Sequence, residues 1–115
     1  MPPSLGDRLF HILQAIDEIQ IILAGSSRES LASDLIRRLA LEREFEIICE
    51  ASRHVTPELQ AREPQIDWKG MVNLGNILRH VYHRVEIDRL LKISEKDLPP
   101  LRAFVQRVLD KEQQK

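Results

Sequence analysis

The sequence predicts an all-α fold, an up-and-down helical bundle of about four long helices plus a short one, which dimerises through helix faces. Three observations support this prediction. Apolar residues recur at intervals of three and four along most of the chain, no segment alternates as a half-buried strand does, and residues that begin or end helices flank the apolar stretches. Because 115 residues is a usual length for one domain, we assign residues 1–115 to a single helical domain.

The composition is that of a globular protein. Hydrophobic residues make up 43% and charged residues 30%, whereas aromatic residues make up only 4%, so the core must consist mainly of Leu, Ile and Val. The formal net charge of −1 provides no overall positive field for binding nucleic acid, although a local basic patch can suffice.

Cofactors and a membrane location are not expected either. The single cysteine, Cys49, cannot form an internal disulfide, and no Cys/His spacing indicates a zinc site, so we expect no metal and no cofactor. The N-terminus lacks a signal pattern, and the longest apolar runs are far too short to cross a membrane. We therefore expect a cytoplasmic protein without a membrane partner.

The first helix is expected from about Leu5 to Ala24. Ser4 followed by Asp7 resembles a capping box, and Gly25 tolerates the left-handed conformation that closes helix ends. One apolar stripe follows the helical period and comprises Leu9, Ile12, Leu13, Ile16, Ile19 and Leu23.

A second helix is expected from roughly Ser30 to His54, with two apolar faces. One face comprises Leu31, Leu35, Leu39, Phe45, Ile48 and Ser52, and the other comprises Ile36, Ala40, Ile47 and Ala51. Two apolar faces indicate burial on more than one side, and in so short a chain the second face is a candidate for dimerisation. Asp34, Glu42 and Glu46 share one side of this helix, where a solvated acidic stripe is favoured over acid–base or metal chemistry.

Helix-capping residues and prolines divide the remainder of the chain. Thr56-Pro57-Glu58 begins a short helix that Pro64 ends, and Asp67 caps the next helix. Ile66 and Met71 have the spacing of a hydrophobic staple, and the inward residues run from Trp68 to Val81. A last helical region begins near Glu86, is kinked or split by Pro99-Pro100, and ends in a polar tail, residues 111–115, that we expect to fray.

The residues with most chemical potential form a cluster between Asn76 and Arg84. On one helix, Asn76, His80 and either His83 or Arg84 would share a side, and Arg79 would lie one turn beyond Gly75. Histidine can act as an acid or a base near neutral pH, and arginine binds phosphate. The composition suits metal-independent attack of an RNA 2′-hydroxyl on its own phosphate. A solvated basic helix end explains the cluster equally well.

Several motifs in consistent order resemble the HepT-like toxin family of the HEPN superfamily. The matching segments are residues 7–16, 46–53, 56–59, 66–68, 76–82 and 97–99, so the resemblance spans nearly the whole chain. It implies a homodimeric helical bundle that is the toxin of a bacterial type VII toxin–antitoxin system and cleaves RNA without metal. It also implies a partner that resembles a minimal nucleotidyltransferase, which binds the toxin and, in some members, adenylylates a tyrosine.

The family motif is an arginine, four to six residues, a histidine, one residue and a tyrosine. By this resemblance, His80 is a catalytic acid or base, Tyr82 is the adenylylation site, and Asn76 matches the polar residue that commonly follows the arginine. The arginine position itself is Gly75, which removes the main donor to the phosphate.

Two hypotheses follow from this departure. In the first, Arg79 substitutes as the phosphate-binding catalytic residue, with His83 in support, and the chain is an endoribonuclease. In the second, the chain is a catalytically degenerate binding module that only pairs with the nucleotidyltransferase, and Gly75→Arg restores cleavage. Gly75 also has a structural explanation, because glycine permits close approach of a neighbouring helix.

Four further residues are better explained by structure than by chemistry. His11 and His54 are isolated and are expected to be surface or structural histidines. Cys49 is expected to be a small buried apolar residue, and Trp68 an interior anchor.

Overall fold

A computed structural model describes residues 3–80 and 86–113, and within these ranges it contains seven helices and no strand. The helices are α1 (Leu5–Leu23), α2 (Arg28–Ser33), α3 (Leu35–Ser52), α4 (Pro57–Ala61), α5 (Trp68–Leu78), α6 (Ile87–Lys96) and α7 (Leu98–Gln113). The predicted all-α class is confirmed. Two of the expected long segments are each divided in two: the second expected helix, which we predicted as one element, and the last helical region, which the prolines were predicted to kink or split.

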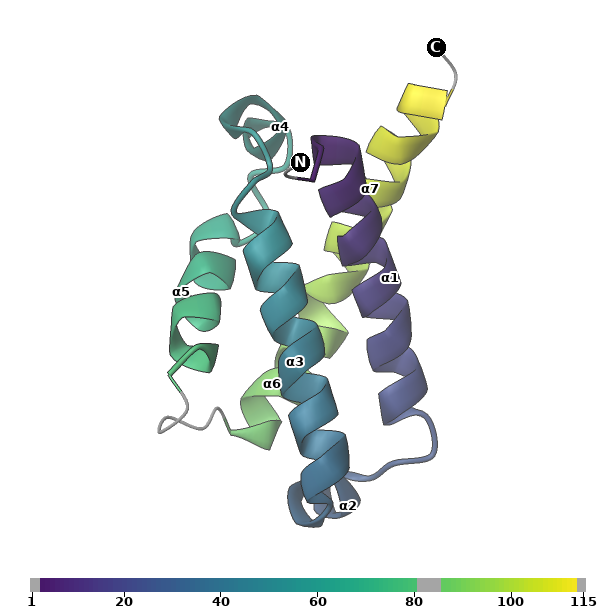
Figure 1. The fold of residues 1–115 in the computed structure, drawn as a ribbon, viewed down its shortest axis with the longest axis vertical. Helices are drawn as coiled ribbons and strands as arrows, with labels where there is room; N and C mark the ends of the chain where they lie inside the picture. Colours follow the sequence, from purple (N-terminus) through teal and green to yellow (C-terminus); the bar gives the residue numbers. More distant parts are fainter. Residues whose placement is uncertain (1–2, 81–85, 114–115) are drawn as a thin grey trace.

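Helix α3 lies between α1 and α5 (Figure 1). Helix α7 packs against α1 and α6, and in this view α6 and α7 lie on the far side of the layer that α1 and α3 form. The short helix α2 contacts α3 and α6 at one end of the molecule. No helix in the described part of the chain is long and apolar enough to cross a membrane.

The ends of α1 follow the sequence prediction. The Ser4 hydroxyl accepts a hydrogen bond from the Asp7 amide at 3.1 Å, and the Asp7 carboxylate accepts one from the Ser4 amide at 3.0 Å. This reciprocal pair satisfies two amides that the first turn leaves without partners. At the other end, Gly25 adopts a φ of 74°, the left-handed conformation that glycine allows at low cost.

The predicted second helix, from Ser30 to His54, is wrong as a single element. The chain is helical from Arg28 to Ser33, breaks at Asp34, and is helical again from Leu35 to Ser52. The Asp34 carboxylate accepts a hydrogen bond from the Arg37 amide at 3.1 Å and so begins α3. An aspartate stabilises a helix better at this capping position than in the interior, where it competes for backbone donors.

The two apolar faces expected on the second helix are not buried along their whole length. In the C-terminal half of α3, Phe45 and Ile48 are fully buried. In the first turns, Leu35 is 53%, Ile36 80% and Leu39 52% exposed. The start of α3 therefore presents an apolar surface, which we call the α3 apolar patch and define as these three residues.

The core consists mainly of Leu, Ile and Val, as the composition predicts. Trp68 is the expected interior anchor, only 9% exposed. Its ring meets Phe104 of α7 edge to face, with 5.6 Å between ring centroids, and its Nε1 donates to the Glu63 carbonyl at 3.2 Å. These contacts fix the beginning of α5 against α7.

The last helical region is split, as the two prolines predict. Helix α6 ends at Lys96, and Pro99 and Pro100 lie in the first turn of α7, where a helix needs no amide donor from them. Helix α7 continues to Gln113, so the tail is helical further than expected.

Candidate active site

Helix α5 carries the first part of the predicted polar cluster and ends before the rest of it. The Arg79 amide donates to the Gly75 carbonyl at 3.2 Å, whereas the His80 amide donates to the Ile77 carbonyl at 3.1 Å. The second bond spans three residues instead of four and marks a tight turn after Leu78. The prediction of one helix through the whole cluster is therefore wrong, and His80 lies just beyond α5.

Tyr82, His83 and Arg84 lie outside the described residues. The modification site expected at Tyr82 and the supporting role expected for His83 thus stay predictions.

Gly75 is buried against α3. A Cβ atom placed on Gly75 would lie 2.9 Å from the Cβ of Cys49, closer than side-chain atoms approach. The glycine therefore permits close contact of the two helices, one of the two interpretations that the sequence left open. Position 75 is buried and faces the core, so an arginine introduced there would not project from an exposed surface of the helix.

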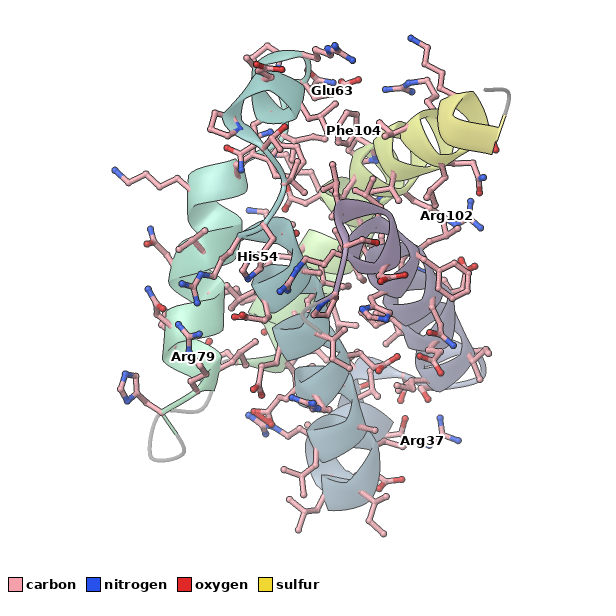
Figure 2. The ribbon with its side chains drawn as sticks, turned by 45° about the horizontal axis from the view of Figure 1, so that its top comes forward. Arg37, His54, Glu63, Arg79, Arg102 and Phe104 are labelled. Atoms are coloured by element: carbon pink, nitrogen blue, oxygen red, sulfur yellow. The ribbon has the colours of Figure 1, made fainter. Side chains whose placement is uncertain are left out.

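Arg79 lies one turn beyond Gly75 and is held by two side chains. Its Nη1 is 3.4 Å from Oε2 of Glu50 on α3, and its Nη2 donates to the side-chain oxygen of Asn76 on α5. Figure 2 shows Arg79 near the end of α5, where the chain leads on to His80. The structure thus brings Arg79 and Asn76 together beside α3, with the guanidinium still partly exposed.

Glu50 is the shared acceptor at this end of the site. Besides Arg79, its carboxylate contacts Nη1 of Arg53 at 3.2 Å and Nε2 of His54 at 3.4 Å. Partial burial acts to raise the pKa of Glu50, but the hydrogen bonds and positive charges of His54 and Arg53 outweigh it and lower the pKa. Glu50 is therefore anionic at neutral pH, and His54 has the structural role that was expected.

A groove of about 380 Å³ adjoins Gly75 and Arg79. We call it the α3 groove. Its charged and polar lining comes from three helices and the residues that directly follow two of them. Helix α1 provides Arg8 and His11, α3 provides Arg43, Glu46 and Glu50, and Arg53 and Arg79 directly follow the last residues of α3 and α5. His11 is therefore not isolated, contrary to what we expected from the sequence, and Arg8 lines the groove although the sequence did not predict a role for it.

The sequence contains only part of the information needed to find the α3 groove. Arg8 and His11 are three residues apart, as are Glu50 and Arg53, so each pair lies on one side of its helix. Sequence spacing cannot show that α1 and α3 turn these sides toward the same groove, because that depends on how the helices pack.

Cys49 and the acidic residues of the second predicted helix have structural environments. Burial, with the negative charge of Glu46, raises the pKa of the Cys49 thiol to about 12, so the cysteine is an inert buried residue as expected. Asp34 caps α3, and Glu46 pairs with Arg43 at 3.2 Å. Within residues 3–80 and 86–113, no three His, Cys, Asp or Glu side chains gather as metal ligands do.

The model of a family described as Ribonuclease HepT-like matches residues 12–108. A candidate RNase of Methanocaldococcus jannaschii is 31% identical over 98 residues, which cover 85% of this chain and 90% of that protein. A probable ribonuclease HepT of Thermococcus cleftensis is 30% identical over 102 residues, which cover 89% of this chain and 93% of that protein. A candidate RNase of Caldanaerobacter subterraneus subsp. tengcongensis is 29% identical over 104 residues, which cover 90% of this chain and 93% of that protein. No solved structure matches the chain significantly.

Proposed function

The chain belongs to the family of HepT-like ribonucleases, and from this premise we propose that it is a metal-independent endoribonuclease and the toxin of a type VII toxin–antitoxin pair. The observation that supports catalysis most directly is the position of Arg79. Its guanidinium is held by Glu50 and Asn76 one turn beyond Gly75, and the next residue is His80. A phosphate-binding cation and a proton carrier thus follow each other at the end of α5.

The proposed reaction uses the RNA itself as the nucleophile. A base removes the proton of a ribose 2′-hydroxyl, the 2′-oxygen attacks the adjacent phosphorus, and the bond to the 5′-oxygen of the next nucleotide breaks. The leaving oxygen takes up a proton, and the products are a 2′,3′-cyclic phosphate and a 5′-hydroxyl. His80 would transfer one of these protons, and Arg79 would stabilise the negative charge that develops on the phosphate oxygens.

An RNA gel with the purified chain in excess EDTA tests this proposal. We expect cleavage of single-stranded RNA and none of the same RNA with 2′-O-methyl groups, because methylation removes the nucleophile. His80→Ala and Arg79→Ala should each reduce the rate by about 100-fold or more, as residues that act as a unit do. Cleavage that needs a divalent metal, or that survives His80→Ala, would contradict the proposed mechanism.

A second candidate function is a binding module without catalytic activity. The observation that favours it is the close packing of Gly75 against Cys49, which leaves no space for the arginine that the family motif places there. In that case the purified chain leaves RNA intact and still binds the nucleotidyltransferase. Binding by the partner with no cleavage at any RNA concentration would favour this candidate over the first.

We further propose that a minimal nucleotidyltransferase is the antitoxin and that Tyr82 is the residue it modifies. Incubation with the cognate nucleotidyltransferase and with ATP should add the mass of an adenylyl group to the wild type. Tyr82→Phe should gain no mass. An active partner that modifies neither protein, or modifies both equally, would show that Tyr82 is not the acceptor.

The α3 apolar patch supports the proposal of a homodimer. Three adjacent aliphatic side chains that are each more than half exposed form a surface that soluble proteins usually bury against a partner. Ile21 of α1 is also 73% exposed, and it lines a cavity with Ala40, the residue of α3 that follows Leu39. Dimerisation would cover these residues in a symmetric contact.

A further inference from the structure

The positive charge of the α3 groove is less compensated by carboxylates than that of three arginines elsewhere in the described chain. Arg28 pairs with Asp88, Arg102 with Asp17 and Arg107 with Glu63, so each of these three guanidinium groups outside the groove has a carboxylate of its own. In the groove, by contrast, one carboxylate must serve several cations. Glu50 contacts Arg53, Arg79 and His54 together.

Among the described residues, Arg8 adds a positive charge that has no carboxylate paired with it. It lines the groove from α1 and forms no ion pair with any residue in the described ranges. Four arginines and two glutamates line the groove, which leaves an excess of two positive charges in a protein whose overall net charge is −1. The excess is therefore local, and it lies where α1, α3 and α5 meet.

The arrangement indicates which kind of anion fits. The four guanidinium groups are supplied by three helices along one open groove, so a ligand with several anionic groups in a row matches them better than a single carboxylate does. Arginine also binds phosphate oxygens through two parallel hydrogen bonds. Single-stranded RNA has one phosphate per nucleotide, and positively charged grooves follow such backbones in other single-strand binding proteins.

We propose that the α3 groove binds the phosphodiester backbone of single-stranded RNA through Arg8 and Arg53, and so leads the strand to Arg79 and His80. The inference rests on the proposed function, because it takes RNA as the substrate. It goes further by assigning backbone binding to two residues on α1 and at the end of α3, outside the sequence cluster on α5. The carboxylates of Glu46 and Glu50 repel the phosphates, so they reduce the affinity of the groove for RNA.

A binding experiment with an uncleavable probe tests the inference separately from catalysis. The probe is a fluorescein-labelled single-stranded RNA with 2′-O-methyl groups at every ribose, and the measurement is fluorescence anisotropy across a series of salt concentrations. We expect Arg8→Ala and Arg53→Ala each to weaken binding by about tenfold, the effect of losing one charged hydrogen bond. The slope of log Kd against log salt should fall by about 0.7 for each arginine lost.

Helix α4 and the residue that follows it provide matched controls. Arg62→Ala and Glu58→Gln change exposed charges outside the α3 groove and should bind the probe as the wild type does. In the groove, Glu46→Gln should bind about threefold more tightly, because removal of a repulsive charge has an effect opposite in sign to removal of an arginine. Circular dichroism confirms that each variant is folded.

The outcomes separate this inference from the proposed function. If the wild type binds the probe through Arg8 and Arg53 but never cleaves natural RNA, the groove assignment holds and the catalytic proposal fails. If the wild type cleaves RNA and folded Arg8→Ala and Arg53→Ala bind and cleave as well as it does, the groove assignment fails. Absence of probe binding by the wild type, or an equal loss in Arg62→Ala, would also overturn it.

Discussion

Gly75 lets α5 approach α3 closely, because only the small side chain of Cys49 lies between the backbones of the two helices at this point. Two effects compete when Gly75 is replaced. Alanine is favoured over glycine within a helix by about 1 kcal/mol. Against this, a new Cβ would lie 2.9 Å from the Cβ of Cys49, and neither atom can move without its backbone. Overpacking of a buried contact costs about 1–3 kcal/mol, so the steric effect should prevail.

Gly75→Ala should therefore lower the free energy of unfolding by about 1 kcal/mol, measured by urea denaturation. Gly75→Arg should be more destabilising still, and we do not expect it to restore cleavage simply by supplying the motif arginine. Cys49→Ala, combined with Gly75→Ala in a double variant, is the matched control. Alanine at position 49 keeps the Cβ that causes the clash, so the double variant should be no more stable than Gly75→Ala with Cys49 in place. A Gly75→Ala variant that is more stable than the wild type would show that the two helices are not in tight contact.

A pair of carboxylates, Glu18 on α1 and Glu44 on α3, gives the fold a pH dependence. Burial raises the pKa of Glu44 to about 7, assisted by the hydrogen bond and the charge of Glu18, while Arg43 opposes the rise. The ordinary pKa of this carboxyl is 4.5. Between these two values the folded chain holds a proton that the unfolded chain releases, so stability falls as the pH rises from about 4.5 to about 7.

Glu44→Gln should remove this dependence, because glutamine keeps a neutral hydrogen-bonding group at every pH. We expect the Tm of the variant at about pH 8 to exceed that of the wild type by roughly 5 °C, the shift that about 1 kcal/mol produces in a domain of this size. At about pH 5 the two should agree closely. Glu42→Gln, which removes a carboxylate of α3 outside the pair, should leave the wild-type pH profile unchanged.

At the scale of the elements, the break between α2 and α3 depends on Asp34. Asp34→Ala should lower the free energy of unfolding by about 1 kcal/mol, because it removes the acceptor of the Arg37 amide. Asp34→Asn keeps a capping oxygen and should cost only a few tenths of a kcal/mol, which makes it the matched control. Equal losses in the two variants would indicate that the charge of Asp34, rather than its hydrogen bond, stabilises the break.

Helix ends could be predicted where a local hydrogen bond defines them. The Ser4–Asp7 capping box, Thr56 and Asp67 all begin helices as the sequence indicated. The break at Asp34 was missed because the apolar periodicity continues across it. The end of α5 was missed for a similar reason, since no glycine or proline follows Leu78 to indicate a stop.

At the scale of the whole molecule, the site depends on contacts between helices that are distant in sequence. The cluster around Arg79 and His80 could be found from residue types and the family motif. The ion pair of Arg79 with Glu50, and the fact that both line one groove with Arg8, could not, because they require the packing of α1 and α5 on either side of α3. Charge balance in the α3 groove is likewise a property of three helices together.

A charge placed at Ile36 tests the proposed homodimer. If the α3 apolar patch is the contact, Ile36→Glu places a charge in its centre, and burial of an unpaired charge costs several kcal/mol. Because Ile36 is 80% exposed in the single chain, the substitution should leave the fold and the Tm of the monomer nearly unchanged.

Sedimentation velocity at micromolar concentration should then show a dimer for the wild type and a monomer for Ile36→Glu. Phe10→Glu is the matched control, since Phe10 is 54% exposed on α1 but lies outside the patch, and it should remain dimeric. A monomeric wild type would refute the dimer. A dimer that persists in Ile36→Glu and dissociates in Phe10→Glu would place the contact on α1 instead, because only the charge buried between the two chains can separate them.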